Sequence, residues 1–303
     1  MFKHLLVPLD GSSLAEAALP SAAYLAQKLN AQVTLVHVIE QDAPQEVHGQ
    51  RHLADPDEAR AYLDEVAGRA FPPEMRVKQH VHTAAVSDIA RSIVAHEDEL
   101  APDLIVMCTH GQSGLRTWLF GSIALQVIGL GTTPVLLIQP EAAGAPTSFA
   151  CHCLLVPLDG DREHEHGLTV AADLAQVCGA RLHLVMVVPT LGTLPGQDSA
   201  SARLLPGATS ALLDLAQDDA EAHLREQVAR LQARGLLVTA GVQRGDPATT
   251  IVRTAEQSDA NVVVLGTHGR SGLEAFWSES VAPQVIGRSH VPLLLVPVRE
   301  PIT

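Results

Sequence analysis

The chain has 303 residues and a formal net charge of −14, from 20 Lys and Arg against 34 Asp and Glu. This length suffices for two domains of ordinary size, each with its own core. The acidic balance argues against extended contact with nucleic acid or an anionic membrane surface, whereas a single nucleotide needs only backbone amides and a few local bases. The first predicted strand begins near Met1, which argues against a signal peptide. No apolar run approaches the roughly 20 residues of a membrane span. We therefore predict a soluble, cytoplasmic protein.

In the first half of the chain, apolar runs of strand length alternate with segments of helical periodicity. Strands are predicted at 3–9, 32–39, 76–82, 104–107 and 135–138, and helices at 12–28, 57–70, 86–97 and from 122 onward. Pro20 falls inside the first helix and allows a kink or a later helix start. The polar stretch 41–55 contains Pro44 and Gly49 and is predicted to be a long surface loop.

The second half repeats this plan. The sequence LLVPLDG occurs at 5–11 and again at 154–160, so Asp10 and Asp159 lie 149 positions apart (159 − 10). The sequence THG occurs at 109–111 and 267–269, which lie 158 positions apart (269 − 111). About nine additional residues therefore lie in the second half, and we predict them in the Gly-, Pro- and Ser-rich stretch 189–207. The predicted domains are 1–140 and 151–303, joined by a linker at 141–150.

Alternating strands and helices with long crossovers favour parallel strand pairing, in an open sheet that is covered on both faces. On such sheets, ligands lie beyond the carboxyl ends of the strands, where the strand order reverses. If the first and fourth strands are neighbours at that reversal, Asp10 and the loop that contains Gly111 face one crevice. The sequence does not establish this adjacency, which is an assumption.

The segment after the fourth strand suits an anion. THG at 109–111 follows the strand at 104–107, and Gly121 and Ser122 open the next helix after nine intervening residues. Glycine lets the backbone approach a ligand closely, and the first amides of a helix are unpaired donors at the positive end of its dipole. We therefore predict a phosphate site here, with a tight turn followed by an ordinary helix cap as the alternative.

These features together resemble the universal stress protein family, in particular its tandem members. The resemblance covers essentially the whole chain and rests on VPLDGS at 7–12, VPLDG at 156–160, HVI at 37–39 and the two glycine loops. It implies two tandem Rossmann-like α/β domains, each with an open five-stranded parallel sheet in the order 3-2-1-4-5 and helices on both faces.

The resemblance also implies that the first domain binds ATP or AMP, with the presence of Mg²⁺ left open. By this resemblance, Asp10 would meet the adenosine end of the nucleotide and Val38 would lie against adenine. The family pattern has two glycines separated by two residues, then nine residues, then Gly and Ser or Thr. The remaining site residues follow that pattern: Gly111, Gly121 and Ser122 match it, Thr109 and His110 fill the two-residue gap, and Cys108 replaces the first glycine.

The second domain departs from the pattern at the phosphate. It keeps GTHG at 266–269, but Glu279 replaces the phosphate-side glycine. A carboxylate at an exposed helix N-terminus is favourable by up to about 1 kcal/mol. It repels a phosphate charge by roughly 4 kcal/mol at a separation of about 4 Å and an effective dielectric constant of about 20. We therefore predict that the second site is empty or strongly weakened.

Other histidine and cysteine groups favour structural roles. CHC at 151–153 resembles a fragment of a metal site, but these residues align with the start of the first strand, which predicts a strand start here as well. His80 and His82 share one face of a strand, yet two histidines without a third ligand are usually surface residues, so no metal site is predicted. Asp10 has the alternative role of capping the following helix, and His110 the role of tying its loop.

No catalytic set emerges. The phosphate-binding Walker sequence and the SGGxDS loop of adenylating enzymes are both missing from the chain, so ATP hydrolysis is expected to be slow at most. We expect a nucleotide-dependent stress-response module that protein partners read. A scaffold with two degenerate sites and a very weak ATPase are the alternatives. In the family that the chain resembles, the last strands of the domains pair, so we expect 135–138 and 292–296 to pair within the chain, with a homodimer as a further arrangement.

Overall fold

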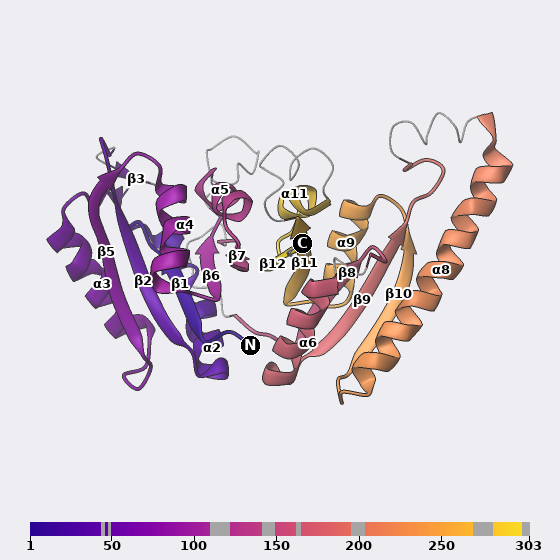
Figure 1. The fold of residues 1–303 in the computed structure, drawn as a ribbon, viewed down its shortest axis with the longest axis horizontal. Coiled ribbons are helices and arrows are strands. Elements are labelled where there is room, and N and C mark those ends of the chain that lie inside the picture. The colour runs from indigo at the N-terminus through magenta and orange to yellow at the C-terminus, as the bar shows by residue number, and fades with distance from the viewer. Residues whose placement is uncertain are drawn as a thin grey trace. The chain divides into compact units, whose positions relative to one another are not determined.

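The computed structural model describes residues 1–43, 46–47, 50–109, 122–140, 149–161, 165–194, 204–268 and 281–298. The chain forms two compact units, of which the first contains Met1–Ala150 and the second Cys151–Thr267 (Figure 1). The predicted linker lies outside the described residues except for its last two positions. There, Phe149 packs edge-on against Tyr24, with ring centroids 5.4 Å apart.

The first half of the chain confirms the predicted alternation of strands and helices. Its strands are β1 (His4–Pro8), β2 (Gln32–Glu40), β3 (Glu46–Val47), β4 (Gln50–Arg51), β5 (Val77–Val86), β6 (Leu104–Cys108) and β7 (Val135–Ile138). Its helices are α1 (Ser13–Glu16), α2 (Leu19–Leu29), α3 (Pro56–Ala70), α4 (Ile89–Leu100) and α5 (Ser122–Leu130). The predicted helix at 12–28 is two helices, because Pro20 stands in the first turn of α2. The predicted loop at 41–55 carries the small antiparallel ladder β3–β4.

The large sheet of the first unit contains the parallel strands β5–β2–β1–β6–β7 in that order. Helices α2 and α3 contact each other and the sheet, and α4 contacts both α5 and β2. The central strands are buried along their length, as in β6, where all five residues are buried. Continuous burial of this kind requires that both faces of the sheet be covered.

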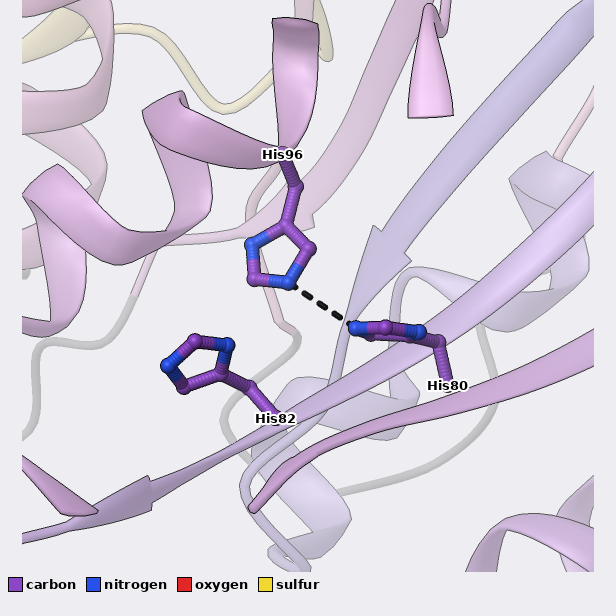
Figure 2. A group of neighbouring side chains, drawn as sticks. All are labelled: His80, His82 and His96. Atoms are coloured by element: carbon purple, nitrogen blue, oxygen red, sulfur yellow. Dashed lines mark hydrogen bonds between the residues drawn. The ribbon is translucent and has the colours of Figure 1, made fainter. Parts of the chain in front are cut away.

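Strand β5 is less buried than the central strands, because β2 is its one partner among the described strands and it lies at the end of the sheet they form. His80 and His82, two positions apart, project from one face of β5 toward α4. There His96, which is 1% exposed, projects from the helix toward them (Figure 2). The sequence-based interpretation that His80 and His82 lack a third histidine is therefore wrong, because the packing of α4 on the sheet supplies one.

The second half contains strands β8 (Cys153–Leu158), β9 (Arg181–Val188), β10 (Val238–Arg244), β11 (Val262–His268) and β12 (Leu293–Val298). Its helices include α6 (His166–Cys178), α8 (Pro206–Gln232), α9 (Pro247–Gln257) and α11 (Val281–Ile286). The second unit contains the parallel strands β10–β9–β8–β11. Helix α8 has 27 residues whereas α3 has 15, so some of the additional length of the second half is helical. Residues 195–203 of the predicted insertion lie outside the described residues.

The two halves repeat local geometry as well as topology. Asp88 and Asp246 accept a hydrogen bond from a backbone amide at the start of α4 and α9. The residues that end α2 and α6, Asn30 and Gly179, are both left-handed, with φ of 51° and 67°. Asparagine and glycine adopt this conformation at little cost, which explains their presence at helix C-termini.

A carboxamide in the second half takes the place of a carboxylate in the first. The carboxylate of Asp103 accepts hydrogen bonds from the amides of Lys3 and His4, at 2.7 and 3.0 Å. The side-chain oxygen of Asn261 accepts from the amides of His152 and Cys153, which precede and begin β8, at 2.9 and 3.1 Å. In both halves, this contact ties the start of the first strand to the residue that precedes the fourth.

Among the described helices, none is both long enough and apolar enough to cross a membrane.

Candidate functional site

The carboxyl ends of β1 and β6 lie next to each other. These strands pair in parallel, with Leu5 beside Leu104 and Leu6 beside Ile105. The adjacency assumed from the sequence is therefore present. It brings the turn that follows β1 and the residues that end β6 to one edge of the sheet, at the point where the strand order reverses.

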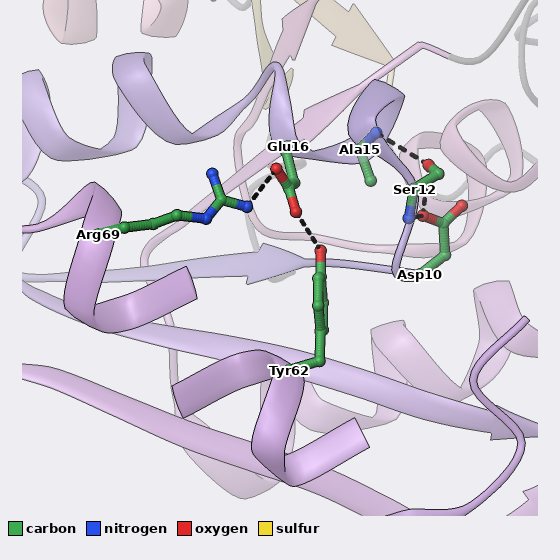
Figure 3. A network of polar contacts seen from close by, with 6 residues as sticks. All are labelled: Asp10, Ser12, Ala15, Glu16, Tyr62 and Arg69. Atoms are coloured by element: carbon green, nitrogen blue, oxygen red, sulfur yellow. Dashed lines mark hydrogen bonds and ion pairs between the residues drawn. The ribbon is translucent and has the colours of Figure 1, made fainter. Parts of the chain in front are cut away.

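Asp10 and Ser12 form a closed turn after β1. The Oδ1 atom of Asp10 accepts from the amide of Ser12 at 2.9 Å and from its hydroxyl at 2.6 Å (Figure 3). The hydroxyl oxygen of Ser12 accepts from the amide of Ala15 at 3.1 Å and so caps α1. Gly11 between them has φ of 90°, a conformation that side chains rarely adopt. The cap of α1 is thus Ser12, and Asp10 supports the cap by orienting that hydroxyl.

An acidic and aromatic group lies beside this turn. Glu16 accepts hydrogen bonds from the hydroxyl of Tyr62 and from the guanidinium of Arg69, both of which project from α3 (Figure 3). Burial, and then the charges of Glu16 and Asp10, raise the pKa of Tyr62, so its phenol stays protonated and donates. These residues are 46 and 53 positions from Glu16, so sequence spacing gave no sign of the contact.

His37, within the HVI segment, holds the neighbouring backbone. Its ring is buried, with Nδ1 at 2.8 Å from the carbonyl oxygen of Leu9 and Nε2 at 2.9 Å from that of Leu53. Both oxygens only accept, so a neutral ring donates one of these bonds and an imidazolium donates both. His37 thus connects the residue before Asp10 to the segment before α3. The next residue, Val38, is 8% exposed.

Cys108 and Thr109 end β6 beside Asp10. Cys108 is 2% exposed, and burial, with a contribution from the charge of Asp10, raises the pKa of its thiol to about 12. The thiol is therefore neutral at physiological pH and points its weak donor toward the carbonyl oxygen of Thr109, at 3.6 Å. The amide of Thr109 donates to the carbonyl oxygen of Ile138 at 2.9 Å, which fixes this strand end against β7.

The phosphate side of the predicted site is only partly described. His110, Gly111 and Gly121 lie outside the described residues, as do Gly269 and Glu279 of the second half and the side chain of Ser122. Helix α5 begins at Ser122, where the sequence predicts it. In the second half, Gly266 lies close to the backbone of α6, since a Cβ atom at Gly167 would lie 3.3 Å from the Gly266 nitrogen.

The described donors and acceptors suit a nucleotide. Asp10 is a carboxylate acceptor, which complements the hydroxyl donors of a ribose. The start of α5 provides backbone amides for an anionic tail. Cys108 adds no negative charge, because its thiol is neutral and packed in the interior.

Among the described residues, Cys151, His152 and Cys153 do not form a group of three ligand atoms close enough to hold a metal ion. Cys151 and Cys153 are both buried at the start of β8, as the repeat predicts. A hydrogen bond with Cys178, and then burial, raise the pKa of Cys151. A buried, protonated thiol is a poor metal ligand.

The chain is a Rossmann-like α/β protein, because its parallel strands alternate with helices and polar turns lie at the carboxyl edge of the sheet. Residues 1–139 and 152–297 match the universal stress protein family, and the chain belongs to that family.

Relatives that carry the same family name match nearly the whole chain or about half of it. The chain is 26% identical over 302 residues to Universal stress protein Rv2005c of Mycobacterium tuberculosis, covering 96% of this chain and 95% of that protein. It is 32% identical over 145 residues to Universal stress protein Sll1654 of Synechocystis, covering 48% of this chain and 84% of that protein. The crystal structure of a universal stress protein from Archaeoglobus fulgidus shares the fold, with a TM-score of 0.65, 19% identity and coverage of 98% of this chain and 97% of that one.

Proposed function

We propose that the first domain binds an adenine nucleotide, ATP or AMP, and that the bound state makes the chain a nucleotide-dependent regulatory module of the cytoplasmic stress response. The observation that carries this proposal is the adjacency of the Asp10 turn and the Cys108–Thr109 strand end at one sheet edge. That edge leads directly into the glycine segment predicted to hold phosphate.

In this proposal, different residues contact the ribose, the adenine and the phosphates of the nucleotide. Asp10 accepts from the ribose hydroxyls and Val38 lies against the adenine ring. Thr109 and the following residues, His110 and Gly111, approach the phosphates through their backbone. Gly121 and Ser122 complete the phosphate end, where Mg²⁺ would accompany ATP.

Only the first domain is proposed to bind tightly. Glu279 stands where Gly121 stands in the first half, and its carboxylate repels a phosphate charge by roughly 4 kcal/mol at about 4 Å with an effective dielectric constant of about 20. A penalty of this size lowers affinity by about 1,000-fold. The expected stoichiometry is therefore one nucleotide per chain.

The direct experiment denatures the purified chain, identifies released nucleotide by mass, and then titrates ATP and AMP into the emptied protein by calorimetry. We expect one site, and a rise in melting temperature that corresponds to about 2.7 kcal/mol at a free ligand concentration about 100-fold above Kd. Two equivalent sites per chain would contradict the assignment of the second domain. The absence of both copurified nucleotide and thermal shift would contradict nucleotide binding altogether.

A matched pair of variants exchanges the key residue between the halves. Gly121→Glu should remove nucleotide binding from the first domain, and Glu279→Gly should add a second site. The double variant should keep one site, now in the second domain. If Gly121→Glu leaves the affinity unchanged, the phosphate is not held at this position.

The replacement of the first glycine by Cys108 favours one other candidate, a scaffold that acts without nucleotide. The two functions predict different nucleotide affinities for the Cys108→Gly variant. A nucleotide site limited by this side chain gains affinity, whereas a scaffold shows no nucleotide effect in either form. A weak ATPase is distinguished from both functions by its ATP hydrolysis rate, which should fall in the Asp10→Ala and Gly121→Glu variants.

We also propose that each domain has the strand order 3-2-1-4-5 and that the domains pair through their last strands. A protease site inserted within 141–148 tests the pairing. After cleavage, the two halves should elute together in size-exclusion chromatography, and separate elution would contradict it. Light scattering of the intact chain then distinguishes a monomer from a homodimer.

A further inference from the structure

Three imidazoles meet at the edge strand of the first unit. His80 and His82 project from one face of β5, and His96 projects toward them from α4, the helix that follows β5 in the chain (Figure 2). Their nearest ring nitrogens all lie within 4.8 Å of one another. Because β5 and α4 are consecutive elements of one unit, this geometry is internal to that unit.

The central ring of this cluster is held in the tautomer that a metal requires. Nδ1 of His96 lies 2.6 Å from the carbonyl oxygen of Ser92, which only accepts, so Nδ1 carries the proton. A neutral His96 ring then has its lone pair on Nε2, the atom that faces His80 at 3.0 Å. A histidine whose other nitrogen donates to a backbone carbonyl is the usual arrangement in metal sites.

The distances within the cluster are close to those of a coordination sphere. Nitrogen ligands about 2.0–2.1 Å from a tetrahedral ion lie about 3.3 Å from one another. The 3.0 Å separation between Nε2 of His80 and Nε2 of His96 is slightly shorter than this, and the ligand nitrogens of all three rings lie within 4.8 Å of one another. Binding an ion therefore requires the partly exposed His80 and His82 rings to adjust around the buried His96 ring. The ring centroids of His82 and His96 lie 5.2 Å apart, with the two rings edge-on to each other.

A carboxylate stands at the rim of the cluster. The Oε2 atom of Glu99 lies 4.0 Å from Nε2 of His96, and the Glu99 side chain is 61% exposed. It can therefore turn toward an ion or leave that position to water.

The second half provides an internal comparison. His80 and His82 pair in register with Val36 and Val38 of β2. The matching residues of β9, Val185 and Val187, pair instead with two residues of β10 that are weak or absent ligands, namely Gly241 and Gln243.

The helix shows the same difference. At the position in α9 that matches His96, 158 residues further on (254 − 96), stands Thr254. Its hydroxyl donates to the carbonyl oxygen of Thr250 at 2.8 Å, which repeats the bond from His96 to Ser92. The second half thus keeps the side-chain bond to the helix backbone but has no imidazole at the positions that match His80, His82 and His96. It therefore serves as an internal control for metal binding by the first half.

We propose that His80, His82 and His96 bind one divalent transition-metal ion of the zinc class, with Glu99 or water as the fourth ligand. Three imidazoles with an open fourth position suit Zn²⁺, Co²⁺, Ni²⁺ and Cu²⁺ and do not suit Mg²⁺, which prefers oxygen. The ion links the edge strand β5 to α4. This inference is independent of nucleotide binding and of the second half.

The test uses the full chain, purified without a histidine tag, stripped with a chelator and kept free of nucleotide. Zn²⁺ is titrated against a chromophoric chelator, and Co²⁺ is followed by its visible ligand-field bands. We expect one tightly bound ion per chain, tetrahedral Co²⁺ bands and a higher melting temperature with Zn²⁺. Mg²⁺ should not compete.

Two partly exposed ligands are replaced, in His80→Gln and His82→Gln, so that the buried His96 and its helix stay intact. Each variant should lose more than roughly 100-fold in Zn²⁺ affinity. Loss of a residue that only hydrogen-bonds to a metal ligand costs at most about 100-fold, so a larger loss identifies a direct ligand. His183→Gln, on β9 of the second half, is the matched control and should bind like the parent. Circular dichroism checks that each variant is folded.

Glu99→Gln assigns the fourth position. A loss of affinity identifies Glu99 as a ligand, and an unchanged affinity assigns water, both within the proposed site. The proposal is overturned if the parent, His80→Gln and His82→Gln bind Zn²⁺ equally, or if bound Zn²⁺ leaves the melting temperature unchanged.

Discussion

Asp10 holds Ser12 through two hydrogen bonds to one carboxylate oxygen, from the amide at 2.9 Å and from the hydroxyl at 2.6 Å. Since the hydroxyl of Ser12 also accepts from Ala15, the carboxylate, the turn and the first residues of α1 form one hydrogen-bonded unit. The residue proposed to meet the ribose is thus oriented by the start of a helix.

The first prediction concerns this unit. Ser12→Ala removes both the helix cap and a donor to Asp10, and it should lower the free energy of unfolding by about 1 kcal/mol. Nucleotide affinity should fall as well, because the Asp10 carboxylate loses a bond that orients it. Urea unfolding and calorimetric titration measure the two effects. Ser12→Thr keeps a hydroxyl and should recover most of both, and equal behaviour of the alanine and threonine variants would argue against the cap.

Cys108 predicts a dependence of stability on alkaline pH. Its folded pKa of about 12 lies above the ordinary value of 9.0, so its contribution is fully present below pH 9. As the pH rises from 9 toward 12, the unfolded chain ionises first and this contribution is lost. The difference in unfolding free energy between the parent and Cys108→Ala should therefore narrow over that range, as measured by urea unfolding at several pH values.

The same burial predicts slow modification. Mass spectrometry of the folded chain after treatment with a thiol reagent should find Cys108 unlabelled, and the partly exposed Cys178 labelled first. Labelling of Cys108 at the rate of Cys178 in folded protein is the result that this account does not allow.

Asp103 predicts a tolerated change and a harmful one. Asn261 fills the matching role in the second half with a neutral oxygen, so Asp103→Asn should change stability by less than about 1 kcal/mol. Asp103→Ala leaves the amides of Lys3 and His4 without their side-chain acceptor and should cost about 1–3 kcal/mol. Chemical unfolding of both variants decides the matter, and similar losses would mean that the charge itself is required.

Two alanine-to-glycine changes in or beside α4 should have opposite signs. Ala101 ends the helix with φ of 47°, a left-handed conformation that costs an alanine roughly 1–2 kcal/mol. Ala101→Gly relieves that cost and should raise the free energy of unfolding by about 0.5–1 kcal/mol after the entropy of glycine is counted. Ala95→Gly, at an exposed position inside the helix, should lower it by about 1 kcal/mol. Thermal unfolding of the pair provides the comparison.

The elements themselves could be predicted because their causes are local. Strand β6 is apolar along its whole length since both of its faces are buried, and that pattern is visible in the sequence. The break before α2 follows from Pro20. The cap at Ser12 and the left-handed ends at Asn30 and Gly179 depend only on side chains a few positions away.

The contacts that build the sites depend on topology, and periodicity does not reveal them. Asp10 lies near Cys108 only because β1 pairs with β6, about 100 residues further along the chain. His96 reaches His80 because of the position at which α4 packs over the sheet. A histidine on a helix has no spacing rule that relates it to a strand, so the sequence showed a pair of imidazoles where the fold assembles three.

The pairing of β1 with both β2 and β6 affects the chain during synthesis. Strand β6 is synthesised long after β1, because Leu104 of β6, the partner of Leu5 of β1, follows Leu5 by 99 residues (104 − 5). At about 5–20 residues per second, the central strand waits roughly 5–20 s with one edge unsatisfied. Ribosome-bound chains that end before Leu104 are therefore the species most exposed to nascent-chain chaperones.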